Sequence, residues 1–170
     1  MIRAGRIGAL VVGWVCTLAG VAAAEWNVLL ITADDMNADS SGWMGSRLGA
    51  TPNLDAFAAT AHRFVNNHVT APICQPSRSA LMTGRVPHRS GALGFNPIRV
   101  GTPTLVMRLR AAGWFTAVID KHVHMQPPSE FAWDMKQSGS GKNPSLFGQH
   151  ASECIAAAAA AGKPFFLNAN

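Results

Sequence analysis

Residues 26–35 read Trp-Asn-Val-Leu-Leu-Ile-Thr-Ala-Asp-Asp, an apolar run that ends in two adjacent aspartates. Its central part, residues 28–31, is aliphatic with no polar alternation, which is typical of a strand buried on both faces of a parallel sheet. Parallel strands need a crossover connection, usually a helix. This segment therefore predicts an α/β fold.

The rest of the chain alternates in the way that such a fold requires. We expect helices over residues 52–62, 76–84, 104–112 and 146–161, and strands over residues 63–69, 114–119 and 165–167. This alternation indicates a mostly parallel central sheet flanked by helices. Because the sequence stops soon after an apolar strand, we expect residues 25–170 to be the N-terminal portion of a larger catalytic domain. In that case residues 165–167 would form an unpaired sheet edge.

The N-terminus has the pattern of an export signal. Arg3 and Arg6 precede an apolar run over residues 7–21, and three alanines follow at residues 22–24. This order predicts a signal peptide over residues 1–24 and a secreted or periplasmic protein. The run is shorter than the roughly 20 residues of a spanning helix, so we expect no stable membrane anchor.

Composition narrows the class of protein further. Of 170 residues, 48% are hydrophobic and 14% are charged, which excludes a disordered chain. The formal net charge of +5 includes the two arginines of the predicted signal peptide. No basic stripe remains, so we expect no nucleic-acid partner.

Three cysteines are present, and Cys16 belongs to the predicted signal peptide. An oxidising compartment would allow Cys74 and Cys154 to form a disulfide. Their settings favour separate roles, because Cys154 lies in an alanine-rich helical segment where a small buried thiol is common. We therefore expect two free cysteines, with the disulfide as the alternative.

The adjacent Asp34 and Asp35 follow the first predicted strand. The carboxyl edge of a parallel sheet is where ligand sites form. Two neighbouring carboxylates repel each other unless a cation offsets their charge, and hard cations such as Ca²⁺ or Mg²⁺ prefer oxygen ligands. The pair indicates either a metal site or a solvated turn.

Residues 74–78 read Cys-Gln-Pro-Ser-Arg at a predicted helix start. A cysteine there lies near free backbone N–H groups and the positive end of the helix dipole. Arg78, four residues on, adds a fixed positive charge one turn away. The spacing indicates a nucleophile that handles an anion, or else a structural cysteine beside a surface arginine.

Residues 74–85, Cys-Gln-Pro-Ser-Arg-Ser-Ala-Leu-Met-Thr-Gly-Arg, resemble the signature of the type I sulfatases. Residues 27–35 resemble the first strand and metal pair of that family, and residues 51–55 resemble its next helix. Lys-His-Val-His at residues 121–124 resembles its Gly-Lys-x-(x)-His segment, although Asp120 stands where glycine is usual. The resemblance extends over residues 26–170, with the heparan N-sulfatase (sulfamidase) branch as the nearest subfamily.

The resemblance implies an alkaline-phosphatase-like fold and a specific chemistry. Cys74 would be oxidised to formylglycine by a formylglycine-generating or sulfatase-maturating enzyme. Its hydrated aldehyde would attack the sulfate of a sulfated carbohydrate. Asp34 and Asp35, together with position 74, would bind Ca²⁺, with Mg²⁺ as the alternative.

The resemblance also implies roles for the neighbouring basic residues. Arg78 would stabilise the hydrated aldehyde, and Lys121 would hold the sulfate. His124 matches the family histidine that lies near the nucleophile or the leaving group, and His122 matches a tighter spacing. Either histidine is equally consistent with an ordinary loop residue.

Two other classes of function stay open at this point. One is a phosphatase or phosphodiesterase of the same fold. Those enzymes usually employ serine or threonine with two zinc ions, so the Cys-x-Pro-x-Arg order argues against this class. The other is a non-catalytic fragment that binds sulfated glycans. Formylglycine at position 74 would favour the sulfatase over both.

Overall fold

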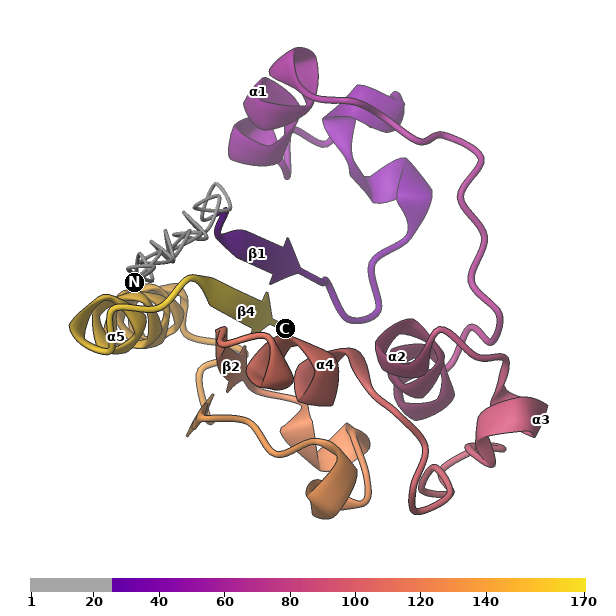
Figure 1. Ribbon diagram of the computed structural model, residues 1–170. Coiled ribbons are helices and arrows are strands. Elements are labelled where there is room, and N and C mark those ends of the chain that lie inside the picture. The colour runs from indigo at the N-terminus through magenta and orange to yellow at the C-terminus, as the bar shows by residue number, and fades with distance from the viewer. Residues whose placement is uncertain (1–25) are drawn as a thin grey trace, which may run out of the picture.

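The computed structural model describes residues 26–170, and the predicted signal peptide lies outside them. Four strands form one sheet in the order β1-β4-β2-β3. All three pairings are parallel, so the carboxyl ends of the strands meet at one edge (Figure 1). The bounds are β1 Val28–Ile31, β2 Phe115–Ile119, β3 Met135–Gln137 and β4 Phe165–Ala169. The expected α/β fold with a mostly parallel sheet is confirmed.

Helices connect and cover these strands. The helices of the described residues are α1 Pro52–Thr60, α2 Cys74–Thr83, α3 Pro87–Ser90, α4 Leu105–Ala111 and α5 Pro144–Ala160. The Thr104 hydroxyl accepts a hydrogen bond from the Met107 N–H and caps α4. Gly84 ends α2 at a φ of 62°, in the left-handed region that glycine adopts without strain.

Short 3-10 turns complete the connections, at Ala38–Ser40 and Gly42–Met44 after β1 and at His122–His124 and Pro128–Glu130 after β2. Figure 1 shows α2 beyond the carboxyl ends of β1 and β4, with α3 beside it. No helix within residues 26–170 is long and apolar enough to cross a membrane.

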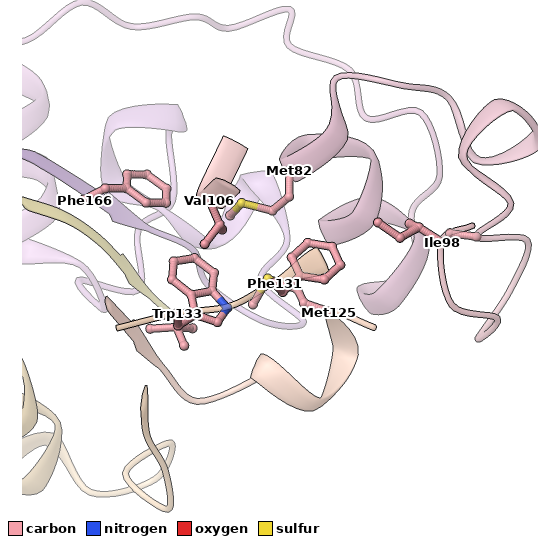
Figure 2. Packing of buried hydrophobic residues seen from close by; sticks show 9 residues of the cluster. Met82, Ile98, Val106, Met125, Phe131, Trp133 and Phe166 are labelled. Carbon is pink, nitrogen blue, oxygen red and sulfur yellow. The ribbon is translucent and has the colours of Figure 1, made fainter. Parts of the chain in front are cut away.

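The sheet is packed on both faces. On one face Phe166 of β4 joins a cluster with Met82 of α2, Val106 of α4 and Trp133 (Figure 2). On the other face Leu167 packs in a second cluster that includes Cys154 of α5. Neighbouring residues of a strand point to opposite faces, so these two side chains show that β4 is covered on both sides.

The structure corrects two expectations about burial. Leu29 and Ile31 of β1 are 50% and 67% exposed, whereas a strand buried on both faces was expected. The expected unpaired edge at residues 165–167 is wrong as well, because β4 pairs with both β1 and β2. The reason for both errors is the strand order, which places β1 at the edge and β4 inside.

Three element assignments also change. Residues 63–69 contain turns and no strand. Residues 135–137 form a short strand that the sequence did not indicate. The helix expected from residue 76 begins at Cys74, because the first N–H groups of a helix have no intrahelical partner and Pro76 is therefore tolerated in the first turn.

Candidate active site

Cys74 is the first residue of α2 and is half-buried. The start of this helix is fixed by the next side chain, since the buried Gln75 amide donates to the carbonyl oxygens of Phe95 at 2.8 Å and Asn96 at 3.0 Å. Cys74 thus lies at the positive end of a ten-residue helix whose first turn is anchored to another loop.

Arg78 lies one turn further along α2 and is only 8% exposed. Its guanidinium donates to the Thr32 hydroxyl at 3.1 Å and to the Asn170 side-chain oxygen, which follow β1 and β4 respectively. It also pairs with Asp34 at 3.3 Å. Because three groups from two strand ends hold it, Arg78 presents a fixed positive charge at the sheet edge.

Lys121 reaches the same edge from the end of β2. Its ammonium contacts the Asp34 oxygen that Arg78 does not bind. The hydrogen bond from Lys121 holds the pKa of Asp34 below its ordinary value, with partial burial acting in the opposite direction and Arg78 adding to the decrease. Asp34 is therefore an ionised carboxylate between two cations.

The turns at this edge adopt an uncommon backbone conformation. Asp35, Asp120 and Lys121 have φ values of 54°, 56° and 49°, and they are the non-glycine residues with positive φ in the described part of the chain. Such values cost energy for L-residues and cluster at functional sites. The φ of Asp120 lies in the left-handed region that glycine adopts without strain.

Asp120 offsets this cost with its side chain. One carboxylate oxygen accepts from the Gly139 N–H at 2.7 Å, and the other accepts from the Ser140 hydroxyl at 2.6 Å. The carboxylate therefore ties the turn that carries Lys121 to the loop after β3. Sequence reasoning noted Asp120 only as a departure from a pattern.

The two histidines of residues 121–124 have different surroundings. The Nδ1 atom of His124 is buried and has no hydrogen-bond partner within the described residues. Burial lowers the pKa of His124, and the positive charges of Lys121 and Arg78 lower it further. His124 also meets Phe95 edge to face, with 6.1 Å between ring centroids. His122 lies 3.4 Å from the Ser138 hydroxyl.

The two cysteines of the described residues are both free. Cys154 lies in α5, and burial raises the pKa of its thiol to about 11, which suits the structural role expected for it. The disulfide alternative is thus absent from the structure.

The oxygen donors at the edge suit a hard cation. Asp34 and Asp35 offer carboxylate oxygens, which Ca²⁺ and Mg²⁺ prefer. No group of three or more histidine, cysteine, aspartate or glutamate side chains gathers around one point within residues 26–170. The expected ligand set of Asp34, Asp35 and Cys74 is therefore not gathered around one point there, although Asp35 is exposed and its carboxylate makes no hydrogen bond or ion pair in that part of the chain.

Sequence reasoning missed two residues of this site, Thr32 and Asn170. The Thr32 hydroxyl donates to the Asn170 oxygen at 2.7 Å, and both groups accept from Arg78. The Asn170 amide also donates to the Ile119 carbonyl at 2.9 Å, which links β4 to β2. Their positions directly after apolar strands were the available signal, because strand ends meet at the ligand edge.

The parallel sheet with helices on both faces has the alkaline-phosphatase-like fold that the resemblance implied. A family model described as Sulfatase matches residues 26–167, and the chain belongs to the sulfatase family. It is 41% identical over 130 residues to arylsulfatase A of Bos taurus, a match that covers 69% of this chain.

Two solved structures are similar to this chain in fold. A 2-O GAG sulfatase matches with a TM-score of 0.59 and 26% identity, over 66% of this chain and 25% of that chain. A protein of Bacteroides thetaiotaomicron classed with the sulfatases matches with a TM-score of 0.67 and 23% identity, over 85% of this chain and 34% of that chain. The chain spans 26% of the length of the bovine arylsulfatase.

Proposed function

We propose that this chain is the catalytic N-terminal portion, residues 25–170, of an exported sulfatase that hydrolyses sulfate esters of sulfated carbohydrates. The observation that carries the proposal is that Arg78, one helical turn from Cys74 in α2, converges with Lys121 on Asp34. A sulfate group is an anion, and fixed cations beside a nucleophile stabilise the charge that develops on its oxygens during transfer.

Each basic residue has a separate task in this proposal. Lys121, on the strained turn after β2, holds a sulfate oxygen. Arg78 is fixed by its contacts to both strand ends and stabilises the charge at position 74. His124 is held neutral by its lowered pKa, so its imidazole can accept or share a proton near the leaving group. His122, in the same 3-10 turn as His124, contributes to substrate binding in this proposal.

Two groups would complete the site. Formylglycine formed from Cys74 supplies a nucleophilic hydroxyl from its hydrated aldehyde. Asp34 and Asp35, with position 74, would hold Ca²⁺, with Mg²⁺ as the alternative, and the cation would neutralise sulfate oxygens. Arg78 and Lys121 both contact Asp34, so a cation bound there would compete with them for its carboxylate oxygens.

One structural relative supports the proposed substrate class. A structural relative acts on a glycosaminoglycan, and we extend this class to the present chain, including N-sulfates as in the sulfamidase branch. The predicted signal peptide over residues 1–24 would bring the protein to the periplasm or outside the cell, where such glycans occur. Maturation requires a formylglycine-generating or sulfatase-maturating enzyme as a partner.

The deciding experiment measures position 74 itself. The full-length protein is produced with a maturation enzyme, and the tryptic peptide of residues 64–78 is weighed by mass spectrometry. We expect the mass of an aldehyde in place of the thiol, together with release of sulfate from a chromogenic aryl sulfate. Cys74→Ala should abolish this release, while the matched variant Cys154→Ala should keep it. Wild-type turnover by Cys74→Ala would reject the mechanism, and turnover of aryl phosphate alone would indicate the phosphatase alternative.

The metal proposal has its own test. Asp34→Asn and Asp35→Asn each remove one anionic oxygen ligand, so each should weaken Ca²⁺ binding in a calorimetric titration. Asp39→Asn, a nearby exposed aspartate of the first 3-10 turn, is the control and should bind as the wild type does. Unchanged affinity in both site variants would reassign the pair to a structural turn.

A further inference from the structure

The end of α2 that lies away from Cys74 opens onto two adjoining hollows. The larger has a volume of about 700 Å³, and its lining includes Arg85, His88, Arg89 and Arg99. The smaller, of about 330 Å³, shares Gly84 with the first and continues toward Arg108 of α4. Because α2 has ten residues, these hollows lie about 15 Å along the helix from Cys74.

Charge of one sign lines both hollows. Four arginines and one histidine contribute to the lining, and no aspartate or glutamate does. The side chains of Arg85, Arg89 and Arg108 make no hydrogen bond or ion pair within the described residues, so their guanidinium groups are available to a ligand. A concave surface lined by one sign of charge concentrates ions of the opposite sign.

Arg99 is held in place by the surrounding backbone. Its guanidinium donates to the carbonyl oxygens of His88 and Arg89, each at 3.1 Å. Its stem lies against Gly91, where an added Cβ would be only 2.9 Å from the Arg99 Cγ. A cation that is fixed before binding loses little side-chain entropy when a ligand arrives.

Cations beside the ends of α2 and α3 also stabilise the negative ends of the helix dipoles. This accounts for Arg99, which caps the carbonyl groups of α3 directly. It does not account for the three arginines without partners, because a helix end carries only about half an elementary charge. Positive charge therefore remains in excess in the hollows.

We propose that the two hollows bind further anionic groups of an extended sulfated carbohydrate whose reacting sulfate lies at position 74. The inference rests on the proposed function for the identity of the ligand. Two adjoining hollows about 15 Å from the nucleophile suit a chain that carries several sulfates or carboxylates, since a single sulfate would occupy only one position. Arginine binds such planar or tetrahedral anions through two N–H groups at once.

The test removes the three unpartnered charges together, as Arg85→Gln/Arg89→Gln/Arg108→Gln. A matched control, Arg47→Gln/Arg63→Gln/Lys163→Gln, removes three exposed charges elsewhere. Binding of a fluorescent heparin-derived octasaccharide and of its desulfated counterpart is measured by anisotropy with the full-length protein. We expect the first variant to lose about tenfold in affinity for the sulfated probe, the order expected for three exposed charge contacts. The control should bind as the wild type does.

Turnover separates this inference from the proposed function. The KM for the octasaccharide should rise in the first variant, while the KM for a small aryl sulfate stays unchanged. Equal affinity of the variant and the wild type for the sulfated probe would overturn the inference, as would equal binding of the desulfated probe or of a DNA oligonucleotide. If no substrate is hydrolysed but the binding pattern holds, the sulfatase proposal falls and the anion-binding surface stands. Circular dichroism melting confirms that each variant is folded.

Discussion

Strands β1 and β4 lie side by side in the sheet, and their burial is the reverse of what their sequences suggest. The purely aliphatic strand Val28–Ile31 is the exposed one, with Ile31 at 67%. β4 contains Asn168 and is nevertheless buried, with Leu167 and Asn168 each at 1%. The difference shows that the place of a strand in the sheet order, and not its hydropathy, decides its burial.

The same comparison explains the position of the candidate site. β4 is held between β1 and β2, so the residues after all three strands are brought to one edge. Asp34 follows β1, Asn170 follows β4 and Lys121 follows β2, and each of them contacts Arg78 or a partner of Arg78. The buried central strand therefore sets the spacing of the residues that carry the chemistry.

The largest loss of stability should come from truncating a buried core side chain of β4. Phe166 is 2% exposed and stacks on Trp133 with 6.0 Å between ring centroids, so Phe166→Ala should lower the free energy of unfolding by about 3–5 kcal/mol. Ile31→Ala removes a side chain that is already mostly in water and should cost less than about 1 kcal/mol. Urea denaturation of both variants measures the difference. Similar losses would mean that β1 is covered in the folded protein.

A smaller effect should follow when the link between the two strand ends is removed. Arg78→Met deletes the bonds to Thr32, Asn170 and Asp34 and leaves these polar groups without their donor. We expect a loss of about 1–3 kcal/mol in the free energy of unfolding. The matched variant Lys121→Met removes the other, more exposed partner of Asp34 and should cost less than about 1 kcal/mol. An equal loss in both variants would contradict the anchoring role of Arg78.

The sequence was informative where local chemistry determines structure. The extent of α4 and the end of α2 at Gly84 were predicted closely, because the signals that end a helix act within one turn. The family motif also identified Asp34, Arg78 and Lys121, which the structure brings together. Long-range pairing could not be predicted in this way.

Two examples show why pairing escaped the sequence. β3 has only three residues and exists through its pairing with β2, so its composition carries little signal. Residues 63–69 have apolar side chains suited to a strand, but Asn66 lies in a turn there and no neighbouring strand pairs with them. Asn170 was missed because its role depends on Arg78, which is distant in sequence.

A still smaller loss of stability should follow substitution of Asp120, which comes directly after β2, the second strand that pairs with β4. Asp120→Gly relieves the positive φ but loses the bonds to Gly139 and Ser140, so it should cost about 1 kcal/mol. Asp120→Ala loses the same bonds and keeps the strain, and it should cost about 1 kcal/mol more. Thermal unfolding of the two variants tests this order. Greater stability of the alanine variant would show that the turn relaxes away from its left-handed conformation.

The last prediction concerns the thiol of Cys154, which packs against the face of the sheet that α5 covers. Cys154 of α5 packs against Leu167 of β4 in the second core cluster and is 1% exposed, and burial raises its pKa to about 11. The thiolate is the reactive form, so at pH 8 only about 0.1% of this thiol is ionised, and the folded protein should protect even that fraction. Cys74 is half-buried at the start of α2 and should react first with a thiol reagent in protein made without the maturation enzyme.

The same pKa predicts how stability depends on pH. Unfolded Cys154 loses its proton near its ordinary pKa of 9.0, whereas the folded thiol keeps it until about pH 11. Between these values the unfolded state binds fewer protons, so the contribution of Cys154 to stability is complete below pH 9 and decreases as the pH rises toward 11. Cys154→Ala should remove this dependence, which urea denaturation at pH 8 and pH 10 can measure. Rapid labelling of Cys154 in the native protein, located by peptide mass mapping, would show that α5 opens readily and that β4 is less protected than its burial indicates.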